Sequence, residues 1–485
     1  MAFQFLQEPI GDSGTIPVIT NWTPIVPYTV YRDSSMASLF YYKLVLEVRI
    51  DDASGELLAK IKQRRNGYSA DVSANEARAI FDLRDIVNSQ LEDTIEDVGT
   101  SAKSIHTIGA NTATLPFSQN NNQVKKIYVK AYEFYSDAAD TAPEDQTGNT
   151  VNDTKYYIAA SLDLNTARGT GEFQGTAFAT YSLDGSTKLF LSDVQEQGFN
   201  LAVSGTAGRL NYIQWDDTTD TGDYHTIGFL NGVSDFASDA YYIGIKFYDS
   251  SGAVINSPGG DAIEYIANTN VNGGSNPDTE TNTNSERLLY FGCGPANLEA
   301  QSRNTEARPS GFANWHFYTI TAYDSDSATP KSATYYFVNQ DGSCKGFKVR
   351  RLAWRNSKGC WDYFNFKMKS TQTLEVSRNN YETMLGQFNS RMYIYDNFGR
   401  GKKTRNTTAI LKETLQTDWI TEADAVLLEN LIMSTNVQII ENADTTYTVP
   451  VMVSDKSFVK KTVANDKMIK YTIKIEYANP VNTNS

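Results

Sequence analysis

The sequence contains few of the side chains on which metal sites, disulfide frameworks and most nucleophilic enzymes depend. Among 485 residues there are only three cysteines and three histidines: Cys293, Cys344, Cys360, His106, His225 and His316. The cysteines form no CxxC pair and are too few for a disulfide framework, so we expect buried thiols and folding in a reducing cytoplasm. The histidines lie in separate contexts without zinc-site spacing. The sequence therefore predicts no enzyme, and no catalytic, cofactor-binding or metal-binding residues.

Long apolar runs and clustered positive charge are also scarce. No run of about 18 apolar residues occurs, and the N-terminus lacks the basic flank and apolar stretch of a signal peptide. We therefore expect neither membrane insertion nor export by that route. Lys and Arg number 43 against 57 Asp and Glu, a formal net charge of −14. Because gripping nucleic acid requires clustered Lys and Arg, sequence-specific nucleic-acid binding is not expected.

Aromatic and β-forming residues, by contrast, are plentiful. Hydrophobic residues make up 40% and charged residues 21%, which is typical of a folded chain rather than a disordered one. The 29 Tyr and 23 Phe recur in short runs, such as 40–42 and 335–337, that favour a pleated, half-buried surface. At roughly 150 residues per domain, the length indicates about three domains. We predict a mainly β fold of multidomain antiparallel β-sandwiches with a few short helices.

Changes in composition divide the chain into four predicted parts. These are an extended N-terminal arm (1–30), a β-rich domain with a short helix (31–168), a β-sandwich domain with a long polar loop at 268–286 (169–345), and a C-terminal β-rich domain with a helix at 422–434 (346–485). The loop at 268–286 has almost no apolar content, so we expect it to be exposed.

The first domain begins with a clear hairpin pattern. Alternating residues at 41–50 and 56–63 flank a polar break, which predicts two antiparallel strands. A small helix is expected after Phe81. The stretch 138–154 is polar and acidic without apolar periodicity, so we predict a loop or insertion there, with a strand resuming at 155–165.

The clearest helix pattern lies at 422–434. Thr421 and Asp424 have the spacing of a capping box. Four apolar residues fall on one helical face: Leu427, Leu428, Leu431 and Ile432. We predict that this face packs against the C-terminal sheet, which includes a hairpin within 347–376.

The N-terminal arm has no helix or hairpin pattern of its own. Four prolines within 1–30 resist helix formation: Pro9, Pro17, Pro24 and Pro27. Apolar residues such as Phe3, Phe5 and Trp22 need a surface to cover. We expect the arm to reach a neighbouring subunit or a partner protein. The alternative is an edge strand folded back on the first domain.

Several short segments have the composition of a site without its spacing. The segment 215–225 gathers four carboxylates that could recruit calcium: Asp216, Asp217, Asp220 and Asp223. It fails the EF-hand pattern, so a plain acidic turn is favoured. The glycine-rich segment 169–175 has the wrong spacing for a phosphate loop. Cys293 could meet His316, and Cys344 could approach Cys360, but structural thiols are favoured for both pairs.

Positive charge is concentrated at only two places, 350–355 and 399–405. Alternation would put Arg351, Ala353 and Arg355 on one face of a strand. A binding face for phosphate or an acidic partner and a plain solvated surface remain equal alternatives.

Four groups of segments, covering about half the chain, carry a resemblance to known proteins. They are YYKLVLEVRIDD to IFDLRDIVNS; LLYFGCGPANLEA followed by WHFYTITAYD; VRRLAWRNSKGCWDYFNF; and DWITEADAVLLENLIMSTNVQII leading into VPVMVSDKSFVKK and DKMIKYTIKIEYA. They resemble a family of tail, neck or baseplate structural proteins of tailed bacteriophages that infect Bacteroidetes or marine bacteria. Each segment is a pattern of strand, turn and helix, and none is a catalytic motif.

The resemblance implies a virion structural protein that folds in the host cytoplasm and is then built into the tail or neck. Its expected partners are other phage tail or neck proteins and further copies of itself in a closed homo-oligomeric ring. The alternative is a tail-associated protein that binds a host receptor or degrades polysaccharide.

Overall fold

The computed structural model describes most of the chain in segments. The described residues are 3–9, 18–19, 27–33, 39–64, 76–91, 105–108, 117–119, 123–160, 188–194, 196–197, 208–230, 240–268, 288–301, 305–324, 327–340, 347–384, 386–395, 401–420, 422–441, 447–455, 457, 459, 469–479 and 481. The chain forms two compact units: Met1–Gln340 with Asn356–Asp362, and Asp341–Arg355 with Tyr363–Ser485. The finer domain boundaries given above stay predictions.

Strands dominate both units. They account for 56% of the structure and helices for 9%, which confirms the predicted mainly β fold. Most strand pairs are antiparallel, as predicted. Among the described strand pairs, β2 with β9 and β11 with β20 are parallel.

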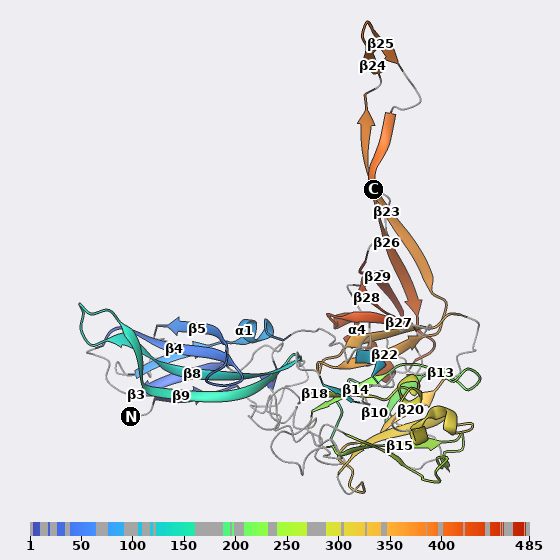
Figure 1. The fold of residues 1–485 in the computed structure, drawn as a ribbon, viewed down its shortest axis with the longest axis horizontal. Coiled ribbons are helices and arrows are strands. Elements are labelled where there is room, and N and C mark those ends of the chain that lie inside the picture. The colour runs from blue at the N-terminus through green and yellow to red at the C-terminus, as the bar shows by residue number, and fades with distance from the viewer. Residues whose placement is uncertain are drawn as a thin grey trace. The chain divides into compact units, whose positions relative to one another are not determined.

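The first sandwich consists of a three-stranded sheet, in the order β1-β3-β6, and a five-stranded sheet, in the order β2-β9-β8-β4-β5 (Figure 1). Its strands are β1 (Phe3–Gln7), β2 (Val18–Ile19), β3 (Tyr28–Asp33), β4 (Phe40–Ile50), β5 (Leu57–Gln63), β6 (Glu76–Phe81), β8 (Val124–Ser136) and β9 (Glu144–Ile158). The short helix α1 (Arg84–Asn88) follows β6, where the sequence predicts a helix. The predicted hairpin is β4 with β5, paired antiparallel.

Side-chain alternation fills the space between these two sheets. Leu44, Leu46 and Val48, at every second position of β4, are fully buried. They belong to one apolar cluster with residues of both sheets: Tyr28, Val30, Ala77, Ala79, Phe81, Ile127, Val129, Ala131 and Tyr157. A one-residue slip of β4 would turn its apolar residues outward, so this cluster fixes the register.

Part of the expected N-terminal arm belongs to this sandwich. β1 pairs with β3, and β2 pairs with β9. Phe3 and Phe5 pack against the same apolar cluster. For these strands the expectation of an arm that leaves its own domain is wrong, and the alternative, a strand folded back on the first domain, holds. Prolines exclude helix but are tolerated beside edge strands, so their spacing could not separate the two. The rest of the arm lies outside the described residues.

The loop predicted at 138–154 is also wrong over most of its length. β9 begins at Glu144 and pairs with β8 at Glu144–Gln146 and again at Val151–Ile158. The first half of β9 is largely exposed, so it carries no apolar alternation, and backbone pairing with β8 holds it in place. Lys60 adds an ion pair to Asp145 from the neighbouring hairpin. The described part of the strand predicted at 155–165 ends at Ile158.

The second sandwich consists of two sheets. The larger sheet has the strand order β10-β11-β20-β19-β15-β16, and β17 also pairs with β15. The smaller sheet has the order β14-β18-β7. The strands are β7 (Phe117–Gln119), β10 (Glu196–Gln197), β11 (Gly208–Ile213), β14 (Thr226–Leu230), β15 (Tyr242–Tyr248), β16 (Val254–Ile255), β17 (Glu264–Ala267), β18 (Leu288–Gly292), β19 (Phe317–Tyr323) and β20 (Tyr335–Asn339). A small hairpin, β12 (Trp215–Asp216) with β13 (Thr221–Gly222), lies between β11 and β14 in sequence. The predicted loop at 268–286 falls outside the described residues, except for Asn268.

Both sheets supply the core of this sandwich. One cluster combines Ile243, Ile245 and Phe247 of β15 with Phe229 of β14 and Phe291 of β18. β14 and β18 are buried at every position, as expected for strands covered on both faces. The connecting helices are η1 (Ile105–Thr107), α3 (Pro295–Glu299), η3 (Thr305–Ala307) and η4 (Pro309–Gly311).

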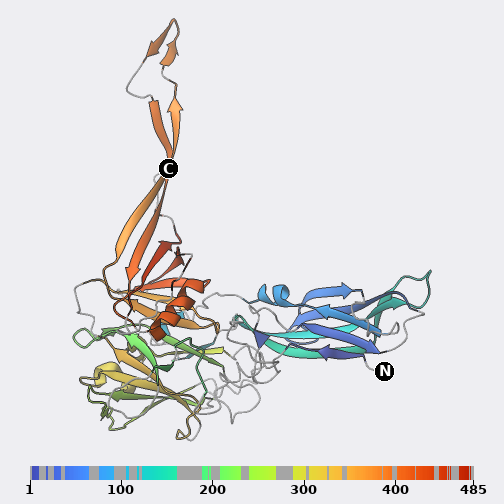
Figure 2. The same ribbon diagram turned by 180° about the vertical axis from the view of Figure 1, so that it is seen from behind.

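The second unit is built on a seven-stranded sheet in the order β22-β21-β27-β28-β29-β26-β23 (Figure 2). Its strands are β21 (Arg350–Arg355), β22 (Trp361–Phe366), β23 (Thr371–Thr383), β26 (Gly401–Gln416), β27 (Val437–Glu441), β28 (Tyr447–Val453) and β29 (Thr472–Tyr477). The predicted hairpin within 347–376 is β21 with β22. Its continuation, β23, is a separate strand at the opposite edge of the sheet.

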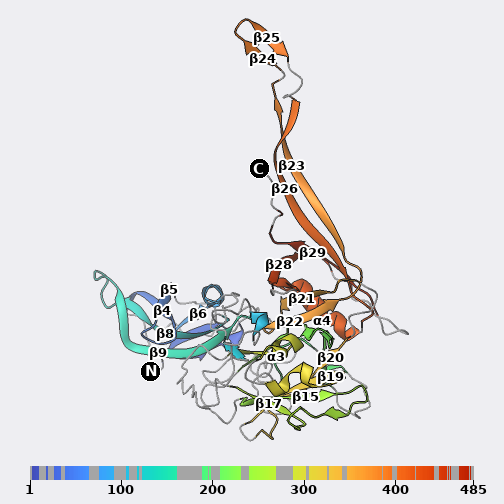
Figure 3. The same ribbon diagram turned by 45° about the vertical axis from the view of Figure 1, so that its right-hand side comes forward.

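The helix predicted at 422–434 is confirmed as α4 (Glu422–Met433). Leu428 and Leu431 are fully buried and Leu427 nearly so. The helix lies beside the strands of this sheet in Figures 2 and 3. Its expected cap, Thr421, is outside the described residues.

The basic segment 350–355 is neither an interface nor a solvated surface. It forms β21, where every residue is buried. Arg350 donates from Nε to Glu413 Oε1 at 2.9 Å and from Nη1 to Glu441 Oε1 at 2.8 Å. Arg351 donates to Asn365 at 2.8 Å and lies over the ring of Tyr363. The charge of Arg350 is therefore balanced inside the unit by two carboxylates distant in sequence, which strand alternation cannot predict.

We predict that Leu431→Ala lowers the free energy of unfolding by about 2–5 kcal/mol, because the side chain is fully buried and truncation leaves a cavity. Met433, which is 66% exposed on the same helix, provides the control, and Met433→Ala should change stability by less than about 0.5 kcal/mol. Chemical denaturation of both variants measures the difference. Equal stabilities would show that α4 is not packed as described.

We predict that Arg350→Met destabilises the chain by about 3–5 kcal/mol, because it leaves the buried Glu413 carboxylate without its cationic partner. Lys348 also contacts Glu441, but its side chain is 68% exposed, so Lys348→Met should cost at most about 1 kcal/mol. Urea denaturation at neutral pH compares the two. A small loss in both variants would contradict the assigned role of Arg350.

Candidate functional site

The candidate site is a two-stranded ribbon that extends from the second unit (Figure 3). β23 and β26 pair antiparallel from Thr371 with Thr414 to Thr383 with Gly401. The pairing of β26 with β29 covers only Lys412–Gln416. The ribbon is therefore defined as Leu374–Thr383 paired with Gly401–Leu411, where β23 is the only described strand that pairs with β26 and Val481 adds a single bridge to Ala409.

Most of the ribbon is open to solvent, and the buried Ala409 lies near its root. Every residue of β23 except the last is exposed, and so is most of β26 from Lys402 to Asn406. Apolar side chains lie in this exposed surface: Leu374 is 52%, Val376 37% and Tyr381 46% exposed. An isolated two-stranded ribbon is marginally stable in water, and exposed apolar strands attract other chains. The ribbon thus has the properties of a surface that is completed by a partner.

A second, smaller hairpin forms the far end of this extension. β24 (Gly386–Asn389) pairs with β25 (Met392–Tyr395). The ring of Tyr393 lies directly across Gly386, where a Cβ would come within 2.2 Å of the ring. Met384, Met392 and Tyr393 are each at least half exposed. The end of the extension therefore presents large adaptable side chains of the kind found in protein interfaces.

The ribbon is the place where exposed cations gather. Lys402, Lys403 and Arg405 are exposed on β26, and within the described part of the chain they form no ion pair. Arg405 stands at a β-bulge, because Asn379 pairs with Asn406 and Asn380 with Thr404. Bulges redirect side chains away from the regular ladder. The basic segment predicted at 399–405 is thus exposed from Lys402 to Arg405, unlike the one at 350–355.

The acidic segment 215–225 is a turn that satisfies its own carboxylates. Asp216 accepts a hydrogen bond from the backbone of Thr218 at 2.9 Å, and such bonds hold the pKa of its carboxyl below the usual value. Asp223 is buried and accepts from the backbone of Gln214 at 2.9 Å. Three carboxylates of this segment do not converge on one point. The favoured interpretation, an acidic turn, agrees with this geometry.

The three histidines contact aromatic rings in different elements. His106 lies edge-on to Trp361, His225 to Phe337 and His316 to Phe317. Among the described residues, no two of the histidines belong to one group of potential metal ligands.

The described cysteines occupy packed positions. Cys293 is buried, and its Sγ lies 3.4 Å from the backbone oxygen of His225. Cys360 is buried against Gly228. Cys344 lies outside the described residues, so its approach to Cys360 stays untested.

A buried acid cluster that the sequence did not indicate links two segments of the first unit. Asp362 accepts from Ser192 Oγ at 2.6 Å and from the backbone of Asp193 at 2.8 Å. Asp193 in turn forms an ion pair with Lys358 and accepts from Ser357 Oγ at 2.6 Å. Burial, followed by repulsion from Asp193, raises the pKa of Asp362 to about 7.

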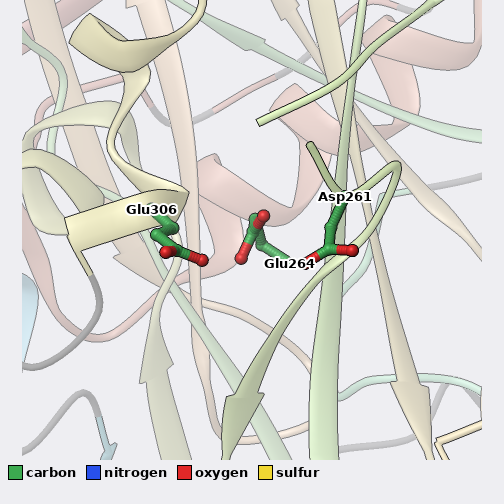
Figure 4. A group of neighbouring side chains, drawn as sticks. All are labelled: Asp261, Glu264 and Glu306. Carbon is green, nitrogen blue, oxygen red and sulfur yellow. The ribbon is translucent and has the colours of Figure 1, made fainter. Parts of the chain in front are cut away.

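Three carboxylates converge at a different place in the second sandwich. Asp261, Glu264 and Glu306 each have an oxygen within 4.8 Å of the others, and Figure 4 shows Glu264 between its two neighbours. Asp261 precedes β17, Glu264 is its first residue, and Glu306 belongs to η3. This group is not evident from the sequence, because Glu306 is remote from the other two residues and only the fold brings it near.

No family model matches the chain. No curated protein matches it either. Among the described residues, no helix is long and apolar enough to cross a membrane.

We predict that Asp362→Asn stabilises the chain more at pH 8 than at pH 5, relative to the unchanged protein. The folded-state pKa is about 7, against an ordinary value of 3.8. The unfolded state therefore loses the proton first, and the stability contributed by the neutral acid is lost as pH rises through about 7. Melting temperatures across this range measure the effect.

The exposed Asp217→Asn serves as the control for this prediction and should show no such pH dependence. Parallel pH profiles for Asp362→Asn and the unchanged protein would contradict the assignment.

Proposed function

We propose that this protein is a virion structural subunit of a tailed bacteriophage, part of the tail, baseplate or neck, and that the ribbon is its assembly arm. The observation that carries the proposal is an exposed two-stranded ribbon with apolar side chains on an otherwise well-packed sheet. The phage context comes from the resemblance of the strand and helix segments described above. The protein's work in this proposal is assembly through protein–protein contacts.

The proposed occupant of the ribbon is a neighbouring copy of the same chain. The chain carries a net charge of −14, while the ribbon exposes Lys402, Lys403 and Arg405. A cationic arm and an acidic remainder are complementary between copies, which favours association and sets its orientation. An arm that docks on a different surface of the next copy makes a heterologous contact, and such contacts close into rings.

The form of the ribbon suits this role. Strands that lack a neighbour pair readily with another chain, and the apolar residues Leu374 and Val376 lie along the open edge strand β23. Docking would cover these side chains and supply β23 with its missing backbone partners.

We predict that replacing Glu375–Ile410 with Asn-Gly abolishes self-association and incorporation into particles while leaving the unit folded. Leu374 and Leu411 are directly paired, so a two-residue turn can join them. Sedimentation velocity of the full chain, melting temperature and complementation of a phage lacking the gene measure the three outcomes. Normal incorporation of the shortened chain would refute the assembly arm.

A charge reversal tests the proposed partner more finely. Lys403→Glu should weaken self-association severalfold at low salt, with the difference shrinking as salt rises. Lys474→Glu is the matched control, since Lys474 is an exposed residue of β29 in the same sheet but outside the ribbon. Equal effects of the two substitutions would contradict the proposed contact. Binding of host-surface sugar that is lost with the ribbon would instead favour a receptor-binding protein.

A further inference from the structure

The carboxylate group of Asp261, Glu264 and Glu306 has a feature that ordinary acidic surface clusters lack. Asp261 and Glu306 are exposed, but Glu264 is only 7% exposed. Its Oε1 atom is buried and has no hydrogen-bond partner. A buried carboxylate oxygen without a partner costs free energy, so a native structure needs a reason to keep one.

The surroundings increase this cost. Burial raises the pKa of Glu264, and repulsion from Glu306 and Asp261 adds to the rise, while Ser257 opposes it. Three negative groups in one place repel one another unless a positive charge lies among them. Within the described ion pairs, no Lys or Arg contacts any of the three.

The backbone holds the three groups in place. The backbone N–H of Ser257 donates to the oxygen of Asp261 at 2.8 Å, and Gly260 donates to Ser257 at 2.9 Å with a φ of +94°. The carboxylate of Glu306 rests against Gly259, where a Cβ would lie 3.1 Å from Oε2. β17 fixes Glu264 through its pairing with Ile245. The carboxylates thus come from three supported segments rather than from one flexible loop.

We propose that Asp261, Glu264 and Glu306 bind a divalent cation, with calcium as the fitting ion. All three ligands are carboxylate oxygens, which hard cations prefer, and no thiolate or imidazole belongs to the group. Calcium accepts irregular geometry and shared water ligands, whereas magnesium demands a nearly ideal octahedron. In this proposal, the ion links η3 to the start of β17. It also gives the buried Glu264 Oε1 a binding partner. This inference is independent of the proposed assembly function.

Isothermal titration calorimetry of the full chain with calcium chloride, after chelator treatment, tests the proposal. We expect one site, with a Kd in the range of about 10⁻⁴–10⁻³ M that is typical of sites with few charged ligands. Glu264→Gln should weaken calcium binding at least about tenfold, since affinity follows the number of charged ligands. Magnesium chloride should bind more weakly than calcium, and tighter magnesium binding would overturn the choice of ion.

Thermal unfolding gives a readout that separates ligand loss from misfolding. In chelator, Glu264→Gln should melt at or above the temperature of the unchanged protein, because an unpartnered buried charge is removed. With calcium, the unchanged protein should gain stability and Glu264→Gln should not. The exposed Glu306→Gln repeats the test at a position where folding is not at stake.

Asp220→Asn, in the acidic turn at 215–225, is the matched control and should respond to calcium like the unchanged protein. Loss of calcium binding in Asp220→Asn but not in Glu264→Gln would overturn the proposal. So would the absence of any calcium heat or melting shift in the unchanged protein.

Discussion

The buried carboxylate of Glu413 determines where the ribbon leaves the second unit. It accepts hydrogen bonds from Arg350 of β21, Gln372 of β23 and Tyr477 of β29. Burial raises its pKa, but these three donors outweigh burial and leave the pKa below the usual value. Burial, together with the hydrogen bond to Glu413, raises the pKa of Tyr477 to about 12. One anion therefore fastens the root of β26, and beyond Lys412 the strand continues with β23 as its only strand neighbour among the described residues.

This anchoring has a mechanical consequence for the proposed arm. A flexible linker would lose orientation, whereas an antiparallel ribbon fixed at its root keeps its strands in register over the paired length from Thr371 to Thr383. The bulge at Arg405 changes the local twist within that length. The apolar pair Leu374 with Leu411 lies close to the root, and the cations lie farther out. An arm built in this way presents a fixed order of apolar and charged contacts, which favours one docking register.

The sequence predicted those parts of the fold whose side chains repeat with a clear period. Alternation gave the β4–β5 hairpin, and the leucines of 422–434 gave α4, because in both cases one face is apolar and the other polar. The first half of the strand at Glu144–Ile158 was missed, since this exposed half has polar residues on both faces. The arginines of 350–355 were misplaced because burial depends on Glu413 and Glu441, whose proximity is a product of the fold. The carboxylate group at Glu264 is hidden for the same reason.

Charge in this chain is used in two ways, and the difference supports a directional assembly. Buried or half-buried cations such as Arg32, Lys358 and Arg350 find carboxylates within their own unit. The exposed cations of the ribbon have no such partner among the described residues. In the proposed particle, these cations therefore face the acidic body of a neighbouring copy, which favours the head-to-tail contact that a ring requires.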